Sequence, residues 1–188
     1  LWIRGTTGLQ TLEGLDNLEY VGGDVFIQPF SPMPDLSGLD HLTMIGGNLN
    51  INGSISSLSG LESLYTVQGD FIIGGMKGGL EISNLSGLSG LAYIGGSLRI
   101  YENQDLESLA GLGNVIVGNY ISIYDNPLLS HCAVQTVCNY LTNLPEQIYI
   151  DNNASGCDNE AEVEAECNGQ PIVVTVFLDV DGDCQPDM

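Results

Sequence analysis

The chain has 188 residues and carries 24 acidic side chains against three basic ones, Arg4, Lys77 and Arg99, which gives a formal net charge of −21. A surface this negative repels phosphate backbones and anionic lipid, so nucleic-acid binding is excluded. No run of about 18 consecutive apolar residues occurs, so the sequence predicts no membrane-spanning helix and no membrane insertion.

A Gly-Leu dipeptide marks a repeat that runs through the first 150 residues. Its copies contain Gly14, Gly38, Gly60, Gly87 and Gly111, at intervals of 22 to 27 residues. The fuller copies span residues 36–51, 58–73, 85–100 and 109–123 and share the pattern Leu-x-x-Leu-x-x-Ile/Val-Gly-Gly-x-hydrophobic-x-Ile. Repetition at such a period predicts a stacked solenoid, in which each copy packs on its neighbours.

A short segment with period-two alternation recurs through the repeats and predicts one strand per turn. These segments are residues 1–3, 25–27, 49–51, 71–73, 98–100, 121–123 and 148–150. Their outer side chains should face the core and the middle one should face outward. Since every strand follows one full circuit, we expect parallel pairing at about 4.8 Å into one continuous sheet.

Glycines stand before most of the predicted strands, at Gly22, Gly23, Gly46, Gly47, Gly69, Gly95 and Gly96. We expect them to supply backbone angles that a residue with a Cβ adopts only at a cost, so that the chain turns sharply into each strand. The other half of each copy has apolar residues three apart. This spacing fits a short helical or 3₁₀ turn, or a bent extended segment.

The repeat unit resembles that of receptor L-domain-like leucine-rich-repeat proteins, of the kind seen on the surface of Bacteroidetes-type bacteria. The resemblance covers residues 1–167 and rests on the five aligned copies. It implies a mainly β fold, a right-handed parallel solenoid with short C-terminal capping helices. It implies no particular activity, because that family is defined by its scaffold and carries varied ligands.

Five cysteines lie in the last third of the chain, at Cys132, Cys138, Cys157, Cys167 and Cys184. Equivalent positions on adjacent turns predict the pairs Cys132–Cys157 and Cys138–Cys167, which would hold two capping helices near residues 131–143 and 159–167. A Cys132–Cys138 bridge is disfavoured, because six residues of helix rise about 9 Å. Zinc binding involving His131 is the rival interpretation, but no CxxC spacing occurs. Disulfides indicate an oxidising compartment, and hence a secreted or cell-surface protein; a partner for Cys184 is not predicted.

Residues 168–188 fall outside the repeats and predict a linker followed by the first strand of a further β module. The β-prone run at residues 172–178 is followed by four alternating or nearby carboxylates, Asp179, Asp181, Asp183 and Asp187. This spacing resembles extracellular calcium loops, so these aspartates are the candidate metal site and calcium the one candidate cofactor, with no cofactor required. The alternative is an ordinary acidic turn.

No catalytic motif occurs around the two histidines, His41 and His131, so the sequence predicts a protein that is not an enzyme. The candidate binding surface is instead the outward face of the sheet. Its last three strands should display Ser97, Arg99, Tyr101, Tyr120, Ser122, Tyr124, Gln147, Tyr149 and Asp151. Tyrosine offers rigid apolar area with a polar tip, which suits recognition, although stacked aromatics also stabilise neighbouring strands.

Two functions follow from this pattern. The first is a non-enzymatic extracellular recognition or adhesion module that binds a protein or glycan through Arg99, Tyr101, Tyr120, Tyr124 and Tyr149. The alternative is a structural subunit of an extracellular filament or stalk, assembled with copies of itself through its open ends and its C-terminal strand.

Overall fold

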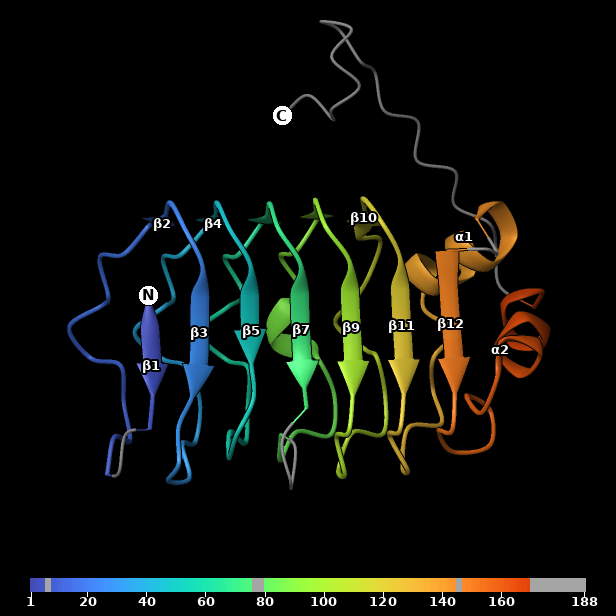
Figure 1. Ribbon diagram of the computed structural model, residues 1–188, viewed down its shortest axis with the longest axis horizontal. Coiled ribbons are helices and arrows are strands. Elements are labelled where there is room, and N and C mark those ends of the chain that lie inside the picture. Colours follow the sequence, from blue (N-terminus) through green and yellow to red (C-terminus); the bar gives the residue numbers. More distant parts are fainter. Residues whose placement is uncertain (6–7, 76–79, 145–146, 170–188) are drawn as a thin grey trace, which may run out of the picture.

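The chain folds into a mainly β-solenoid of about six turns, closed at its C-terminal end by two short helices, which confirms the predicted fold class (Figure 1). The computed structural model describes residues 1–5, 8–75, 80–144 and 147–169. The turns lie side by side along the long axis of the molecule, and the strands run across that axis.

The larger sheet has seven strands in the order β1-β3-β5-β7-β9-β11-β12, each parallel to its neighbours. The strands are β1 (Trp2–Arg4), β3 (Val25–Gln28), β5 (Leu49–Ile51), β7 (Phe71–Gly74), β9 (Leu98–Tyr101), β11 (Ile121–Tyr124) and β12 (Ile148–Asp151). The predicted segments pair in register, as in Ile123 with Ile100 and Ile150. The isoleucines at this position form one buried column of the core.

A second parallel sheet, which the sequence did not predict, runs beside the first in the order β10-β8-β6-β4-β2. Its two-residue strands are β2 (Tyr20–Val21), β4 (Met44–Ile45), β6 (Thr66–Val67), β8 (Tyr93–Ile94) and β10 (Ile116–Val117). The predicted continuous sheet is the larger one, and this second sheet is an addition to it. The residue before each glycine turn points into the core, while the residue preceding it remains at least partly exposed.

The third side of each turn is closed by successive i to i+3 backbone hydrogen bonds. The N–H of Leu39 donates to the carbonyl of Leu36 (3.1 Å), and that of Leu42 to Leu39 (2.9 Å). One copy forms a 3₁₀ helix, η1 (Ser86–Leu88). Gly38 has a φ of 108°, and a Cβ there would lie 2.6 Å from the carbonyl carbon of Leu12. Gly38, like Gly60 and Gly111 in later copies, therefore requires glycine in two ways.

The glycines before the strands of the larger sheet are needed for a different reason from the one expected. None of the seven has a left-handed φ. Instead, a Cβ on Gly47 would lie 2.5 Å from Oδ1 of Asp24, which accepts a hydrogen bond from the N–H of Asn48 (2.8 Å). The same side-chain-to-backbone bond recurs from Asp70 to Asn48 and from Ser97 to Asp70. Close stacking of the turns, rather than backbone angle, selects glycine at Gly46, Gly47, Gly69, Gly95 and Gly96, whereas a Cβ on Gly23 would meet no atom within 4 Å.

A ladder of three asparagines, Asn103, Asn126 and Asn153, follows the C-terminal ends of β9, β11 and β12. Oδ1 of Asn126 accepts from the backbone and side-chain N–H groups of Asn103 (both 3.1 Å). Nδ2 of Asn126 donates to the carbonyls of Ile100 and Tyr124 and to Oδ1 of Asn153 (2.9 Å). Asn103 and Asn126 are fully buried. Their amides are tolerated in the core because each is hydrogen-bonded to the next turn.

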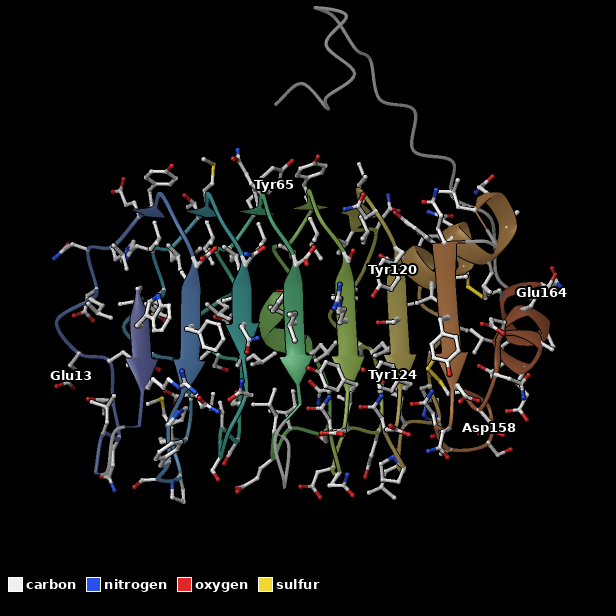
Figure 2. All side chains as sticks on the ribbon, viewed as in Figure 1. Glu13, Tyr65, Tyr120, Tyr124, Asp158 and Glu164 are labelled. Atoms are coloured by element: carbon white, nitrogen blue, oxygen red, sulfur yellow. A yellow bond between two sulfur atoms is a disulfide. The ribbon has the colours of Figure 1, made fainter. Side chains whose placement is uncertain are left out.

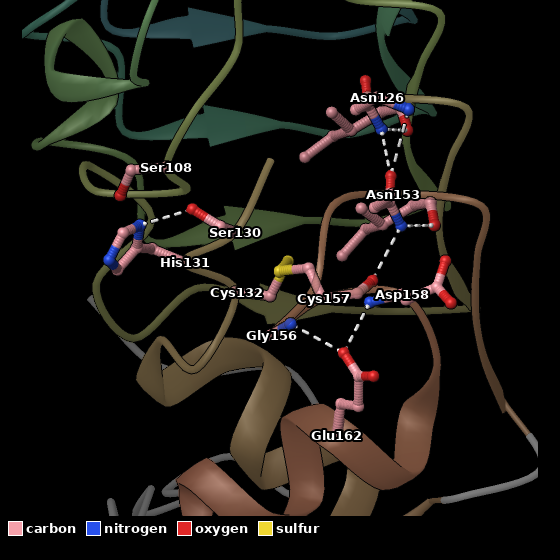
Figure 3. The surroundings of a disulfide bond; sticks show 12 residues. Ser108, Asn126, Ser130, His131, Cys132, Asn153, Gly156, Cys157, Asp158 and Glu162 are labelled. Atoms are coloured by element: carbon pink, nitrogen blue, oxygen red, sulfur yellow. Dashed lines mark hydrogen bonds between the residues drawn. A yellow bond between two sulfur atoms is a disulfide. The ribbon is translucent and has the colours of Figure 1, made fainter. Parts of the chain in front are cut away.

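Two helices, α1 (Gln135–Asn143) and α2 (Glu160–Cys167), cover the last turn. The first begins four residues later than expected. Disulfides join Cys132 to Cys157 and Cys138 to Cys167, with Cα separations of 5.7 and 5.4 Å, which is the predicted pairing. Glu162 accepts hydrogen bonds from the N–H groups of Gly156 and Asp158 beside the first bridge (Figure 3).

The ladder predicts a large stability loss on Asn126→Ala. The substitution leaves buried carbonyls and amides without partners, so the free energy of unfolding should fall by about 2–5 kcal/mol in a denaturant titration. The exposed Asn17→Ala is the matched control and should change it by less than about 0.5 kcal/mol. Equal effects of the two substitutions would contradict a structural role for the ladder.

The disulfides predict the order in which the cap unfolds. Non-reducing peptide mapping should recover the two observed pairs. The double variant Cys138→Ser, Cys167→Ser should lose about 2–5 kcal/mol of stability. Hydrogen exchange should then increase first in α2, which this bridge ties to α1. Recovery of a Cys132–Cys138 peptide would refute the pairing.

Candidate functional site

The candidate binding residues lie on the outward face of β9, β11 and β12, where the parallel register places them side by side. Tyr124 is opposite Tyr101 on one neighbour and Asp151 on the other. Ser122 is opposite Arg99 and Tyr149 in the same way. Figure 2 shows Tyr120 and Tyr124 near the two ends of β11. The structure thus brings all five predicted residues onto one face, in two groups.

The first group is a series of three tyrosine rings. Tyr101 and Tyr124 stack with centroids 5.1 Å apart and an interplanar angle of 6°, and Tyr124 meets Tyr149 at 6.1 Å and 59°. Tyr101 also lies against the backbone of Gly75, where a Cβ would be 2.6 Å from its ring carbon Cζ. Tyr101 is therefore held between two neighbours and supports strand packing, as in the alternative interpretation of these aromatics.

The second group centres on Arg99. Its guanidinium carbon lies 5.3 Å from the centroid of the Tyr120 ring, in a cation–π contact. A terminal nitrogen of the same side chain lies 3.9 Å from Oδ2 of Asp70. Sequence reasoning missed Asp70. Asp70 directly precedes β7, just as Tyr120 directly precedes β11, so the two residues hold equivalent positions in their turns. Aligning these equivalent positions would have identified it.

Exposure separates the tyrosines that a ligand can reach from those that mainly pack. Tyr149 is 49% exposed and Tyr120 is 37% exposed, whereas Tyr101 and Tyr124 are half-buried. Ser97 and Ser122, expected to be displayed outward, are each only 4% exposed. Ser122 points outward but is covered, because larger side chains on the same and adjacent strands surround it.

The local charge around the tyrosines is negative. Burial raises the pKa of Tyr124 above 10.0, and charge interactions with Tyr101, Asp125 and Glu102 raise it further. A hydrogen bond from its hydroxyl to Asp151 (2.9 Å) raises the pKa of Tyr149. The pKa of each of these two tyrosines is higher in the folded state than in the unfolded state. Their titration therefore leaves the free energy of unfolding unchanged below pH about 10 and lowers it as the pH rises through the folded-state pKa.

The two histidines lie in separate turns of the described part of the chain. Nδ1 of His131 lies 3.0 Å from Oγ of Ser130, next to an open depression of about 500 Å³ lined by Ser83, Asn84, Ser86, Glu107, Ser108, Ala110 and His131. His41 is exposed in a separate turn. Within the described ranges, no group of three or more His, Cys, Asp or Glu side chains is placed to hold a metal ion. The zinc alternative fails, because four of the cysteines form disulfides.

The predicted calcium site lies outside the described residues. Asp179, Asp181, Asp183 and Asp187, together with Cys184, belong to residues 170–188. Of the predicted second domain, only Asn168 and Gly169 are described, and both continue the end of α2 through hydrogen bonds to Glu164 and Glu166. Calcium binding and the further β module therefore stay predictions.

Comparison of the chain with protein-family models, curated proteins and solved structures gives no match. The class that the fold defines is a parallel β-solenoid with a disulfide-linked cap. Its resemblance to receptor L-domain-like leucine-rich-repeat proteins stays a prediction. None of the helices that the structure describes is long and apolar enough to cross a bilayer.

The Tyr149–Asp151 hydrogen bond predicts a measurable titration effect. Asp151→Ala removes the acceptor and its charge, so the pKa of Tyr149 should fall toward its ordinary value of about 10. Tyrosine 13C NMR across an alkaline titration measures this pKa directly. Asp105→Ala is the control, because it changes the net charge by the same amount. The pKa of Tyr149 should be higher in Asp105→Ala than in Asp151→Ala. A lower pKa in Asp105→Ala would contradict a specific effect of the Tyr149–Asp151 hydrogen bond.

Proposed function

We propose that this chain is a non-enzymatic recognition or adhesion module that works outside the cell and binds a protein or glycan through the outward face of its larger sheet. The observation that carries the proposal is the cluster of four tyrosines and one arginine on three adjacent strands. Aromatic and arginine side chains are the residues that most often dominate binding energy at protein surfaces.

The arrangement of the cluster supports a binding role beyond strand packing. Tyr120 and Tyr149 expose more than a third of their surface, although each contacts a neighbouring side chain that orients it. Rings held in this way lose little conformational entropy when a ligand packs on them. The rigid parallel sheet beneath fixes their spacing, as a recognition surface requires.

Two further features support an extracellular location. The two disulfides connect the last turns and the capping helices, and such bonds persist in oxidising compartments. The net charge of −21 disfavours nucleic acid and anionic membrane as partners, which is compatible with a protein or glycan ligand.

The alternative proposal is a structural subunit of an extracellular filament or stalk. It is favoured by the first turn, where Leu9, Leu15, Leu18 and Val21 are only partly buried against the core. The equivalent residues of the next turn, Met33, Leu39, Leu42 and Ile45, are fully buried. An end surface of this kind suits stacking on another chain. Sedimentation at increasing protein concentration would reveal assembly, and a concentration-independent monomer would remove this alternative.

The recognition proposal predicts a binding defect for Tyr149→Ala without a loss of fold. Wild type and variant should be screened against arrays of extracellular proteins and of glycans. The variant should bind the wild-type partner more weakly by about 1–3 kcal/mol, because an exposed aromatic contact is lost. Its melting temperature should stay close to wild type. Tyr124→Ala is a less specific test, since it also removes the stack on Tyr101.

Trp2→Ala is the matched control, because Trp2 is 66% exposed on the same sheet and contacts Phe26 at 5.5 Å, far from β12. It should leave partner affinity unchanged. If Tyr149→Ala binds like wild type, or if it lowers only the melting temperature, the cluster is structural and the proposed function is wrong.

A further inference from the structure

Two neighbouring polar atoms on the outward face of the larger sheet are buried and unpaired. They are Oγ of Ser122, a residue only 4% exposed, and Nε of Arg99. Within the part of the chain that the structure describes, neither atom has a hydrogen-bond partner. Arg99 and Ser122 are register partners on β9 and β11. Buried polar atoms are nearly always hydrogen-bonded to protein or to ordered water, so an adjacent unpaired donor and hydroxyl mark a place where water or a ligand supplies the missing partner.

Aromatic side chains surround this pair. Tyr120 and Tyr124 lie near the two ends of β11 (Figure 2), on either side of Ser122 along the chain. Tyr149 is the register partner of Ser122 on β12. The cover is made of surface side chains, since Arg99 is 38% exposed and Tyr149 is 49% exposed. Exposed side chains change rotamer within nanoseconds, so a ligand reaches Ser122 without any change in the sheet. The two unpaired atoms lie beneath these side chains, so a ligand that reaches them displaces part of the cover and meets polar atoms flanked by tyrosine rings.

We propose that Arg99, Ser122, Tyr120 and Tyr149, here called the Ser122 subsite, bind a neutral hexopyranose residue of a glycan. The proposal rests on the proposed function, because it assigns a ligand class to the same sheet face. One sugar hydroxyl accepts a hydrogen bond from Nε–H of Arg99 and donates another to Oγ of Ser122. The C–H face of the sugar ring packs on a tyrosine ring, which offers apolar area beside a polar tip.

The surrounding charges select a neutral sugar over an acidic one. A carboxylate would also accept hydrogen bonds from Arg99 and Ser122, but the charge of Arg99 is already opposed by Asp70 at 3.9 Å. Asp151 lies beside the same cluster, bonded to the Tyr149 hydroxyl (2.9 Å). A second negative charge would be repelled at this distance, whereas an uncharged hydroxyl is not.

The test uses the full chain on an array of neutral oligosaccharides, uronate-bearing oligosaccharides and extracellular proteins, with titration of each hit. Wild type should bind a neutral glycan. Ser122→Ala should weaken that binding about three- to ten-fold, the effect of one hydrogen bond. Its melting temperature should stay level or rise, because the variant removes an unpaired buried hydroxyl. Arg99→Lys, which lacks Nε–H but keeps the charge, should also weaken binding, and the exposed Ser89→Ala should not.

The outcomes separate this inference from the proposed function. If only uronate-bearing or only protein ligands bind, and Tyr149→Ala abolishes that binding, the neutral-sugar inference is wrong and the function of the face stands. The same conclusion follows from a second outcome. In it a neutral glycan binds, Ser122→Ala and Arg99→Lys bind it as tightly as wild type does, and Tyr149→Ala binds it more weakly. If Tyr149→Ala also matches wild type, or if nothing on the array binds, both the inference and the proposed function fall.

Discussion

Each turn of the solenoid must place its backbone directly over the turn before it, because parallel hydrogen bonds connect neighbouring strands along the whole stack. Equivalent residues of successive repeats therefore become direct neighbours in space. An apolar residue at an inward position forms a continuous column, as Ile51, Ile73 and Ile100 do. A polar residue at an inward position is stable only where the next turn supplies its partner, as Asn103 and Asn126 do for one another.

The same stacking organises the outward face. Side chains at equivalent positions of adjacent strands are separated by roughly the strand spacing of 4.8 Å, and this distance brings two tyrosine rings into stacking contact. Tyr101 and Tyr124 follow this rule. A small residue at an equivalent position is overhung by its larger neighbours, which is why Ser122 is buried although its strand presents it to solvent. The packed tyrosines and the covered serine thus have one common cause.

The features that depend on spacing were predictable from the sequence. The repeat period gave the stack, the alternation placed the strands of the larger sheet, and offsets from those strands gave both disulfide pairs. The second sheet was missed because a strand of two residues shows no alternation. The glycines before the strands were located but explained wrongly, since a need for close approach and a need for a left-handed φ look identical in a sequence.

The parts of the candidate site that depend on neighbours were not predictable in the same way. Asp70 was one carboxylate among 24, and only its register with later turns sets it beside Arg99. The burial of Ser122 depends on the size of residues from three different strands. The asparagine ladder was equally hidden, because asparagine is a common turn residue and its role appears only when three turns are superposed.

The placement of the disulfides gives the molecule a mechanical direction. Tension along its long axis pulls directly on the hydrogen bonds between turns, since the strands run across that axis. Within the described residues, the turns near β1 carry no disulfide, so only the backbone and non-covalent contacts hold each of them to the next turn, whereas Cys132–Cys157 crosslinks the last turns. Under load the stack should peel from its first turn inward and lengthen stepwise. The tyrosine face, at the crosslinked end, would be the last part to lose its shape.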